Sequence, residues 1–140
     1  MSVTDDDIRD ILTETRVIAL VGWSPNPARP SHGVARFLAA HGYRVIPVNP
    51  GQAGGMALGE RIRGSLSEIT EPVDMIDIFR RPEAIGPIVD EALERFPELK
   101  TVWMQLGLFH PEAAAKARAR GIRVVENRCP AIEYPRLIGA

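Results

Sequence analysis

The sequence has few of the residues that build disulfide frameworks and metal centres. It holds one cysteine and three histidines in 140 residues, and none of them falls in a CxxC, HxH or HExxH pattern. A single cysteine forms no disulfide within its own chain, so nothing points to an oxidising compartment. We therefore expect a protein without a metal site.

Long apolar runs and an excess of one charge are also missing. The longest apolar run is five residues, 17–21, far below the roughly 20 residues that span a bilayer. Lysine and arginine number 17 against 18 aspartate and glutamate, a formal net charge of −1. This balance gives no bulk attraction to nucleic acid or to an anionic membrane, and we expect neither as a partner.

What the chain does have is an ordinary globular composition. Hydrophobic residues make up 45% and charged residues 25%, a balance typical of folded domains and not of disordered chains. The length suits one domain, which we take as residues 1–140. Residues 4–7 are a threonine and three aspartates, whereas a secretory signal would be basic there, so a cytoplasmic protein is favoured.

The hydrophobic pattern alternates between apolar runs and helical spacing. The expected strands are 17–21, 43–49, 73–79, 101–106 and 122–126. The expected helices are 4–15, 31–41 with Ser31 as N-cap, one that opens at 81–83 with Pro82 at its first position and continues as 87–96 after a kink near Gly86, 111–120 and 130–137. Residues 51–72 are expected to be a mobile loop with a short helical turn. The alternation predicts an α/β fold, a single Rossmann-like domain whose five-stranded parallel sheet has the order 3-2-1-4-5 and helices on both faces.

The end of the first strand has the features of an anion-binding turn. In such a sheet, ligands bind beyond the carboxyl ends of the strands. Gly22 permits a sharp turn there, Ser24 and Arg29 follow as donors, and a helix begins at Ser31. Free N–H groups at a helix start attract phosphate. The segment matches neither the P-loop pattern nor the spacing of GxGxxG.

The end of the second strand points to a phosphorylated sugar. Val48, Asn49 and Pro50 lie there, where an NAD-binding domain carries the acid that binds the adenosine ribose. A carboxylate would repel a ribose phosphate, so its absence suits a ligand that carries one. The alternative is a strand that simply ends at a proline.

The third strand end carries an aromatic ring and two cations, and the fourth carries a side-chain amide. Phe79 offers a surface for stacking, and Arg80 and Arg81 follow it. The alternative for both arginines is a solvated surface position, although a helix start disfavours a cation unless an anion lies between. Gln105 lies at the fourth end, where either a ligand or neighbouring backbone would satisfy its amide.

The fifth strand end carries the single thiol. Asn127, Arg128 and Cys129 precede a helix start, and a neighbouring cation favours thiolate chemistry. The alternative is that Cys129 is a small buried hydrophobe, as most free cysteines are.

Taken together, these strand ends resemble those of small CoA-binding domain proteins, which are related to the N-terminal domain of the succinyl-CoA synthetase α-subunit. The resemblance covers roughly residues 8–138. The motifs that carry it are Gly22-x-Ser24, Pro27-x-Arg29-x-Ser31, Pro47-Val48-Asn49-Pro50, Asp77-Ile78-Phe79-Arg80, Trp103-Met104-Gln105-Leu106-Gly107 and Asn127-Arg128-Cys129-Pro130.

The resemblance implies coenzyme A as the ligand and gives each strand end a role. The first end would hold the phosphates, the second the adenosine, the third would close over the nucleotide and the fourth would border the pantetheine arm. The residues are, in that order, Gly22, Ser24, Arg29 and Ser31; Val48, Asn49 and Pro50; Phe79 and Arg80; and Gln105 and Gly107. The candidate binding set as a whole also includes Trp23, His32, Arg81, Asn127, Arg128 and Cys129.

No set of nucleophile, base and orienting residue is visible in the sequence. We therefore expect no catalytic residues, and a protein that binds CoA or an acyl-CoA as a small-molecule ligand without transforming it. Two alternatives remain open. One is an oxidoreductase of the NADP type, because the arginines suit a ribose phosphate. The other is a redox protein in which Cys129 forms a mixed disulfide with the CoA thiol.

Overall fold

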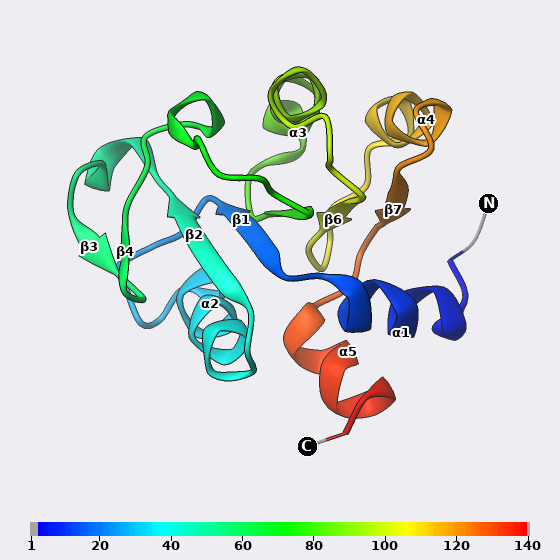
Figure 1. The fold of residues 1–140 in the computed structure, drawn as a ribbon, viewed down its shortest axis with the longest axis horizontal. Helices are drawn as coiled ribbons and strands as arrows, with labels where there is room; N and C mark the ends of the chain where they lie inside the picture. The colour runs from blue at the N-terminus through cyan, green and yellow to red at the C-terminus, as the bar shows by residue number, and fades with distance from the viewer. Residues whose placement is uncertain (1–2, 140) are drawn as a thin grey trace.

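The computed structural model describes residues 3–139, which form one α/β domain around a parallel sheet. The strands of this sheet are β1 (Val17–Val21), β2 (Arg44–Val48), β5 (Met75–Ile78), β6 (Thr101–Met104) and β7 (Arg123–Val125). They run in the order β2-β1-β5-β6-β7, and every neighbouring pair is parallel (Figure 1). The predicted fold class is confirmed.

The strand order differs in one detail from a literal reading of 3-2-1-4-5. The strand expected at 73–79 pairs with β1 and does not lie outside β2. The position outside β2 holds a single parallel bridge between Val48 and Arg63. Asn49 N–H donates to Arg63 O at 2.9 Å, and Arg63 N–H donates to Pro47 O at 3.0 Å. With Arg63 counted as the third strand, the pattern is 3-2-1-4-5 with β7 added at the far edge.

Helices cover both faces of the sheet (Figure 1). On one face lie α3 (Pro82–Arg95) and α4 (Pro111–Ala119), and on the other α1 (Asp5–Glu14), α2 (Pro30–Ala40) and α5 (Pro130–Leu137). Ala19 and Ile76 pack in the apolar cluster with α3 and α4, whereas Leu20 and Trp103 pack in the cluster with the other three helices. Burial on both faces explains why the strands read as continuous apolar runs. Within residues 3–139, no helix is long and apolar enough to cross a membrane.

The helix starts follow local capping rules, with one correction. Thr4 caps α1, since its hydroxyl accepts from Asp7 N–H at 3.1 Å while the Asp7 carboxylate accepts from Thr4 N–H at 3.0 Å. The prediction of Ser31 as the N-cap of α2 is wrong. Arg29 is the N-cap and Pro30 takes the first helical position, which suits proline because the N–H it lacks would be unpaired there.

The helix expected to open at Pro82 does begin there, and its main part is not confined to 87–96. α3 runs without interruption from residue 82 to 95, with Pro87 inside it. Pro87 removes the hydrogen bond that would reach the carbonyl of Glu83. Both residues are exposed, so water reaches that part of the helix and the helix continues.

Residues 51–72 are more ordered in their secondary structure than the sequence predicted. They contain two 3-10 turns, η1 (Pro50–Gln52) and η2 (Leu66–Glu68), and a hairpin of β3 (Met56–Ala57) and β4 (Glu60–Arg61). An ion-pair network joins this segment to β2. Arg44 contacts Glu60 at 2.8 Å and Glu71 at 2.6 Å, and the buried Arg63 contacts Glu71 at 2.9 Å.

One carboxyl group interrupts the apolar interior. Asp77 lies in β5 between Leu20 of β1 and Trp103 of β6, and it is fully buried. Neither of its side-chain oxygens has a hydrogen-bond partner in the described part of the chain. This burial raises the pKa of the Asp77 carboxyl well above its usual range, because a medium of low dielectric constant disfavours the charged form.

The turn after β1 is held tightly against the neighbouring strands. Gly22 has φ +93°, and a Cβ atom on it would lie 2.3 Å from the carbonyl oxygen of Phe79, just after β5. The N–H groups of Gly22 and Trp23 both donate to Val48 O, at 3.0 and 3.2 Å. The turn is therefore tied to the ends of both neighbouring strands, and glycine is the residue that fits there.

We predict that Asp77→Asn removes a pH dependence of folding stability. Between about pH 4 and the raised pKa of Asp77, the folded protein keeps the Asp77 proton and the unfolded chain releases it. The free energy of unfolding of the wild type therefore falls as the pH rises through that range. Relative to the wild type, the variant therefore gains stability over that range. Urea unfolding at several pH values measures the difference. Asp90→Asn, which removes an exposed carboxyl, serves as control, and equal slopes for wild type and Asp77→Asn would contradict the prediction.

We predict that Gly22→Ala destabilises the fold more than Gly121→Ala. Both glycines have positive φ, but the space around Gly121 is open. Gly121→Ala should cost about 1–2 kcal/mol for the left-handed backbone. Gly22→Ala should cost about 1–3 kcal/mol more, because the new methyl group overlaps the Phe79 carbonyl. Denaturant unfolding of both variants gives the two values, and similar losses would show that the contact with Phe79 relaxes freely.

Candidate functional site

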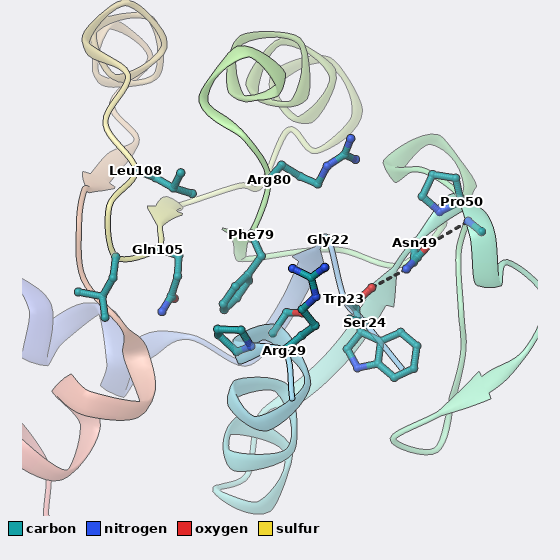
Figure 2. Close-up of a pocket in the computed structure, with 14 residues that line it drawn as sticks. Gly22, Trp23, Ser24, Arg29, Asn49, Pro50, Phe79, Arg80, Gln105 and Leu108 are labelled. Carbon is teal, nitrogen blue, oxygen red and sulfur yellow. Dashed lines mark hydrogen bonds between the residues drawn. The ribbon is translucent and has the colours of Figure 1, made fainter. Parts of the chain in front are cut away.

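A cleft of about 680 Å³ opens at the carboxyl ends of β1, β2, β5 and β6. It lies where the strand order predicts, because α2 follows β1 on one face of the sheet and α3 follows β5 on the other. Its lining consists of Gly22, Trp23, Ser24, Arg29, Pro30, Ser31, Asn49, Pro50, Gly51, Phe79, Arg80, Gln105, Leu106 and Leu108. Figure 2 shows Asn49 and Pro50 on one side, Gln105 and Leu108 on the other, and Phe79 and Arg29 between them.

Short hydrogen bonds shape the loop between β1 and α2. The Ser24 hydroxyl accepts from Asn26 N–H at 3.1 Å, and the Asn26 side chain accepts from Ala28 N–H at 3.0 Å. His32 does not line the cleft. Its Nδ1 lies 2.9 Å from Ser24 O, and its ring stacks on Trp23 at 5.9 Å between centroids. His32 therefore stabilises the loop through these contacts, outside the lining of the cleft.

Asn49 links the first two strand ends. Its Nδ2 donates to Trp23 O at 2.6 Å and its Oδ1 accepts from Gly51 N–H at 2.8 Å (Figure 2). The same amide thus positions the loop after β1 and caps the 3-10 turn after β2. An acid at this position would repel the Trp23 carbonyl, which explains structurally why the amide suits the second strand end.

The charge of the lining residues is entirely positive. Arg29 and Arg80 contribute two exposed guanidinium groups, and within the described part of the chain no aspartate or glutamate lines the cleft. Neither arginine takes part in an ion pair with any residue of the 3–139 range. The first turn of α2, in which Ser31 is only 4% exposed, also lines this space. Unpaired guanidinium groups beside a helix start favour an anionic ligand.

The side of the cleft formed after β6 is different in character. Gln105 is buried, and its Oε1 has no hydrogen-bond partner among the described residues. The residues beside it are Leu106, which is 53% exposed, and Leu108, which packs partly on the core. A ligand donor at this place would satisfy the Gln105 oxygen, since a buried acceptor without a partner is unfavourable.

Three of the predicted binding residues serve the scaffold. Val48 is buried, and its carbonyl receives the two N–H groups of the Gly22 turn. Gly107 has φ +83°, and its N–H donates to the Asn127 side chain at 2.7 Å. Asn127 itself has φ +59°. The pair Gly107 and Asn127 therefore fixes the loop after β6 without lining the cleft.

The remaining three candidates lie outside the cleft. Arg81 is 85% exposed and faces Glu83 at 3.7 Å, which matches the surface alternative. Arg128 pairs with Glu133 at 3.3 Å. Cys129 is buried in the apolar cluster with α1, α2 and α5. The geometry therefore gives no support to a reactive Cys129 at the cleft rim, and the small buried hydrophobe is the better description.

Sequence reasoning missed four of the lining residues. They are Pro30, Gly51, Leu106 and Leu108. All four lie at the strand ends that the fold predicts, but a proline, a glycine and two leucines carry no polar side chain that would mark them as ligand contacts in the sequence. The apolar character of the cleft beyond β6 is thus a feature that only the structure brings out.

The lining holds no residue set for acid–base or nucleophilic chemistry. No histidine, cysteine, aspartate or glutamate of the described chain lines it, and neither the Ser24 nor the Ser31 hydroxyl is hydrogen-bonded to such a side chain there. Among residues 3–139, no group of three or more histidine, cysteine, aspartate or glutamate side chains is placed to hold a metal ion.

Comparison of the chain with known proteins identifies its family. A Bacillus subtilis (strain 168) protein, Uncharacterized protein YneT, is 37% identical over 123 residues, which cover 88% of each chain. Cell-free ID.343 from Thermus thermophilus is 39% identical with a TM-score of 0.90, covering 97% of this chain and all of its own. A hypothetical protein from Pyrococcus horikoshii OT3 is 38% identical with a TM-score of 0.90, covering 99% of this chain and 94% of its own. The family described as CoA binding domain matches residues 16–135, and the chain belongs to that family.

Proposed function

We propose that this protein binds coenzyme A in the cleft at the strand ends and holds it without transforming it. The observation that carries the proposal is the pair of unpaired arginines, Arg29 and Arg80, in a lining that contains no carboxylate. The membership of the CoA binding domain family supports the same ligand.

The charges of coenzyme A match this lining. Its pyrophosphate and its 3′-phosphate carry about four negative charges near neutral pH. Arg29 lies at the start of α2, where the helix dipole and free N–H groups also favour an anion. Arg80 follows β5, and its side chain passes next to Gly22 in the lining of the cleft. Guanidinium groups suit both phosphates because their planar fork donates two hydrogen bonds at once.

The second strand end supports a ligand with a phosphorylated ribose. A dinucleotide-binding domain specific for NAD presents an acid there to the ribose hydroxyls. This chain presents Asn49, whose amide is already bonded to Trp23 and Gly51. NADP also carries a ribose phosphate, so it is the competitor that a binding experiment must include.

A ligand panel tests the proposal directly. We expect calorimetric titration of the purified protein to give the tightest binding for CoA, weaker binding for dephospho-CoA and NADP, and the weakest for NAD. The order follows from the ribose phosphate and from the pantetheine arm, which only the CoA ligands carry. Tighter binding of NAD or NADP than of CoA would overturn the proposal.

Arginine variants test the placement of the phosphates. We predict that Arg29→Ala and Arg80→Ala each weaken CoA by about 1.5–3 kcal/mol, the value of a hydrogen bond to a charged group, and leave the weak affinity for pantetheine the same. Arg81→Ala is the matched control, because Arg81 has the same charge but points to solvent. Titration of the three variants with CoA measures the effect, and equal losses at Arg80 and Arg81 would mean that only the general positive field matters.

A further inference from the structure

The end of the cleft beyond β6 presents apolar side chains on a rigid turn. Leu106 is 53% exposed and, with Leu108, lines the cleft. The turn is held by two hydrogen bonds, from Leu108 N–H to Gln105 O at 2.9 Å and from Gly107 N–H to the Asn127 side chain at 2.7 Å. Because the backbone is fixed, Leu106 does not reach the core, and it remains available to a ligand.

This apolar end lies opposite the end expected for the adenosine. In doubly wound folds, a nucleotide places its adenosine beyond the second strand and crosses the reversal point. Here the second strand ends at Asn49 and Pro50, and Figure 2 shows Gln105 and Leu108 on the other side of Phe79. A CoA molecule held at Arg29 and Arg80 in that direction brings its thiol end toward Leu106 and Leu108.

The same end contains nothing that would attack a thioester. No histidine, cysteine, aspartate or glutamate lines the cleft, and the two serines of the lining lie at the loop before α2 and in its first turn. Hydrolysis or transfer of an acyl group needs a positioned base or nucleophile. An acyl thioester bound here would therefore meet apolar surface and no reactive side chain.

We propose that the ligand of this site is an acyl-CoA, whose apolar acyl group packs on Leu106 and Leu108. The inference rests on the proposed binding of CoA and deepens it. Gln105 lies on the same side of Phe79 as Leu108 (Figure 2), and its unpartnered Oε1 would accept a hydrogen bond from the amide-containing arm. The protein thus holds the thioester intact and releases it unchanged.

A chain-length series tests the acyl group separately from CoA itself. The purified full chain is titrated with CoA, acetyl-CoA, butyryl-CoA and hexanoyl-CoA, and with hexanoate as a control for non-specific apolar binding. Full burial of a methylene is worth about fourfold in affinity. Since the cleft is open, we expect about half of that free energy, or roughly twofold for each added methylene. Hexanoate alone should show no binding.

Two variants locate the effect on the protein. Leu106→Ser should clearly reduce the ratio of the CoA Kd to the hexanoyl-CoA Kd, with the remainder left by Leu108. A ratio taken within each variant cancels any change in CoA affinity itself. Phe109→Ser is the matched control, because Phe109 belongs to the same loop and is 55% exposed but does not line the cleft. It should retain the wild-type ratio.

The possible failures are distinguishable. No binding of CoA to the wild type would overturn the proposed function together with this inference. Binding of CoA with equal affinity for all acyl lengths, or a chain-length effect that Leu106→Ser leaves intact, would overturn the acyl assignment alone. A third outcome is that Leu106→Ser and Phe109→Ser both change the oligomeric state while the length of the acyl group has no effect on affinity. The exposed loop would then form a contact between copies of the chain, and the acyl assignment would be wrong.

Discussion

The close contact of Gly22 with the Phe79 carbonyl is the constraint on which the cleft depends. The end of β1 can approach β5 this closely only because residue 22 has no Cβ atom and adopts a positive φ. From that point the chain turns toward α2 on one face of the sheet, while the chain after β5 turns toward α3 on the other. The two departures leave an open space above the strand ends, and the first turn of α2 faces it.

Some of the side chains that line this space lack favourable partners within the protein. Arg29 and Arg80 bring like charges to one cleft without a counter-charge in its lining, and Gln105 carries an acceptor without a partner among the described residues. At the sheet edge, by contrast, Arg44 is paired with Glu60 and Glu71. The proposed binding of an anionic, amide-bearing ligand rests on this combination of guanidinium groups without an ion pair and an amide oxygen without a partner at the strand ends.

Much of the fold was predictable because it follows from local patterns. Continuous apolar runs located the strands, and the acidic start at Thr4 and the apolar positions after it located the first helix. The local pattern also located the start of α3 at Pro82, but it did not show that the helix continues through Pro87, where water can reach the exposed carbonyl region of Glu83. The hairpin of β3 and β4 escaped prediction because its strands are two residues long and depend on ion pairs with distant residues.

The sequence by itself determined the α/β class, the positions of the main strands and the absence of an acid at the second strand end, because each depends on residues close together in the chain. It also placed ten of the lining residues by naming the strand ends. The tertiary structure decided which side chains at those ends face the cleft. It turned Arg81 to solvent and buried Cys129, and it placed Leu106 and Leu108 along the cleft wall. The reason is that neighbours in a strand or loop point in opposite directions, and only packing against the rest of the molecule sets which direction leads to the ligand.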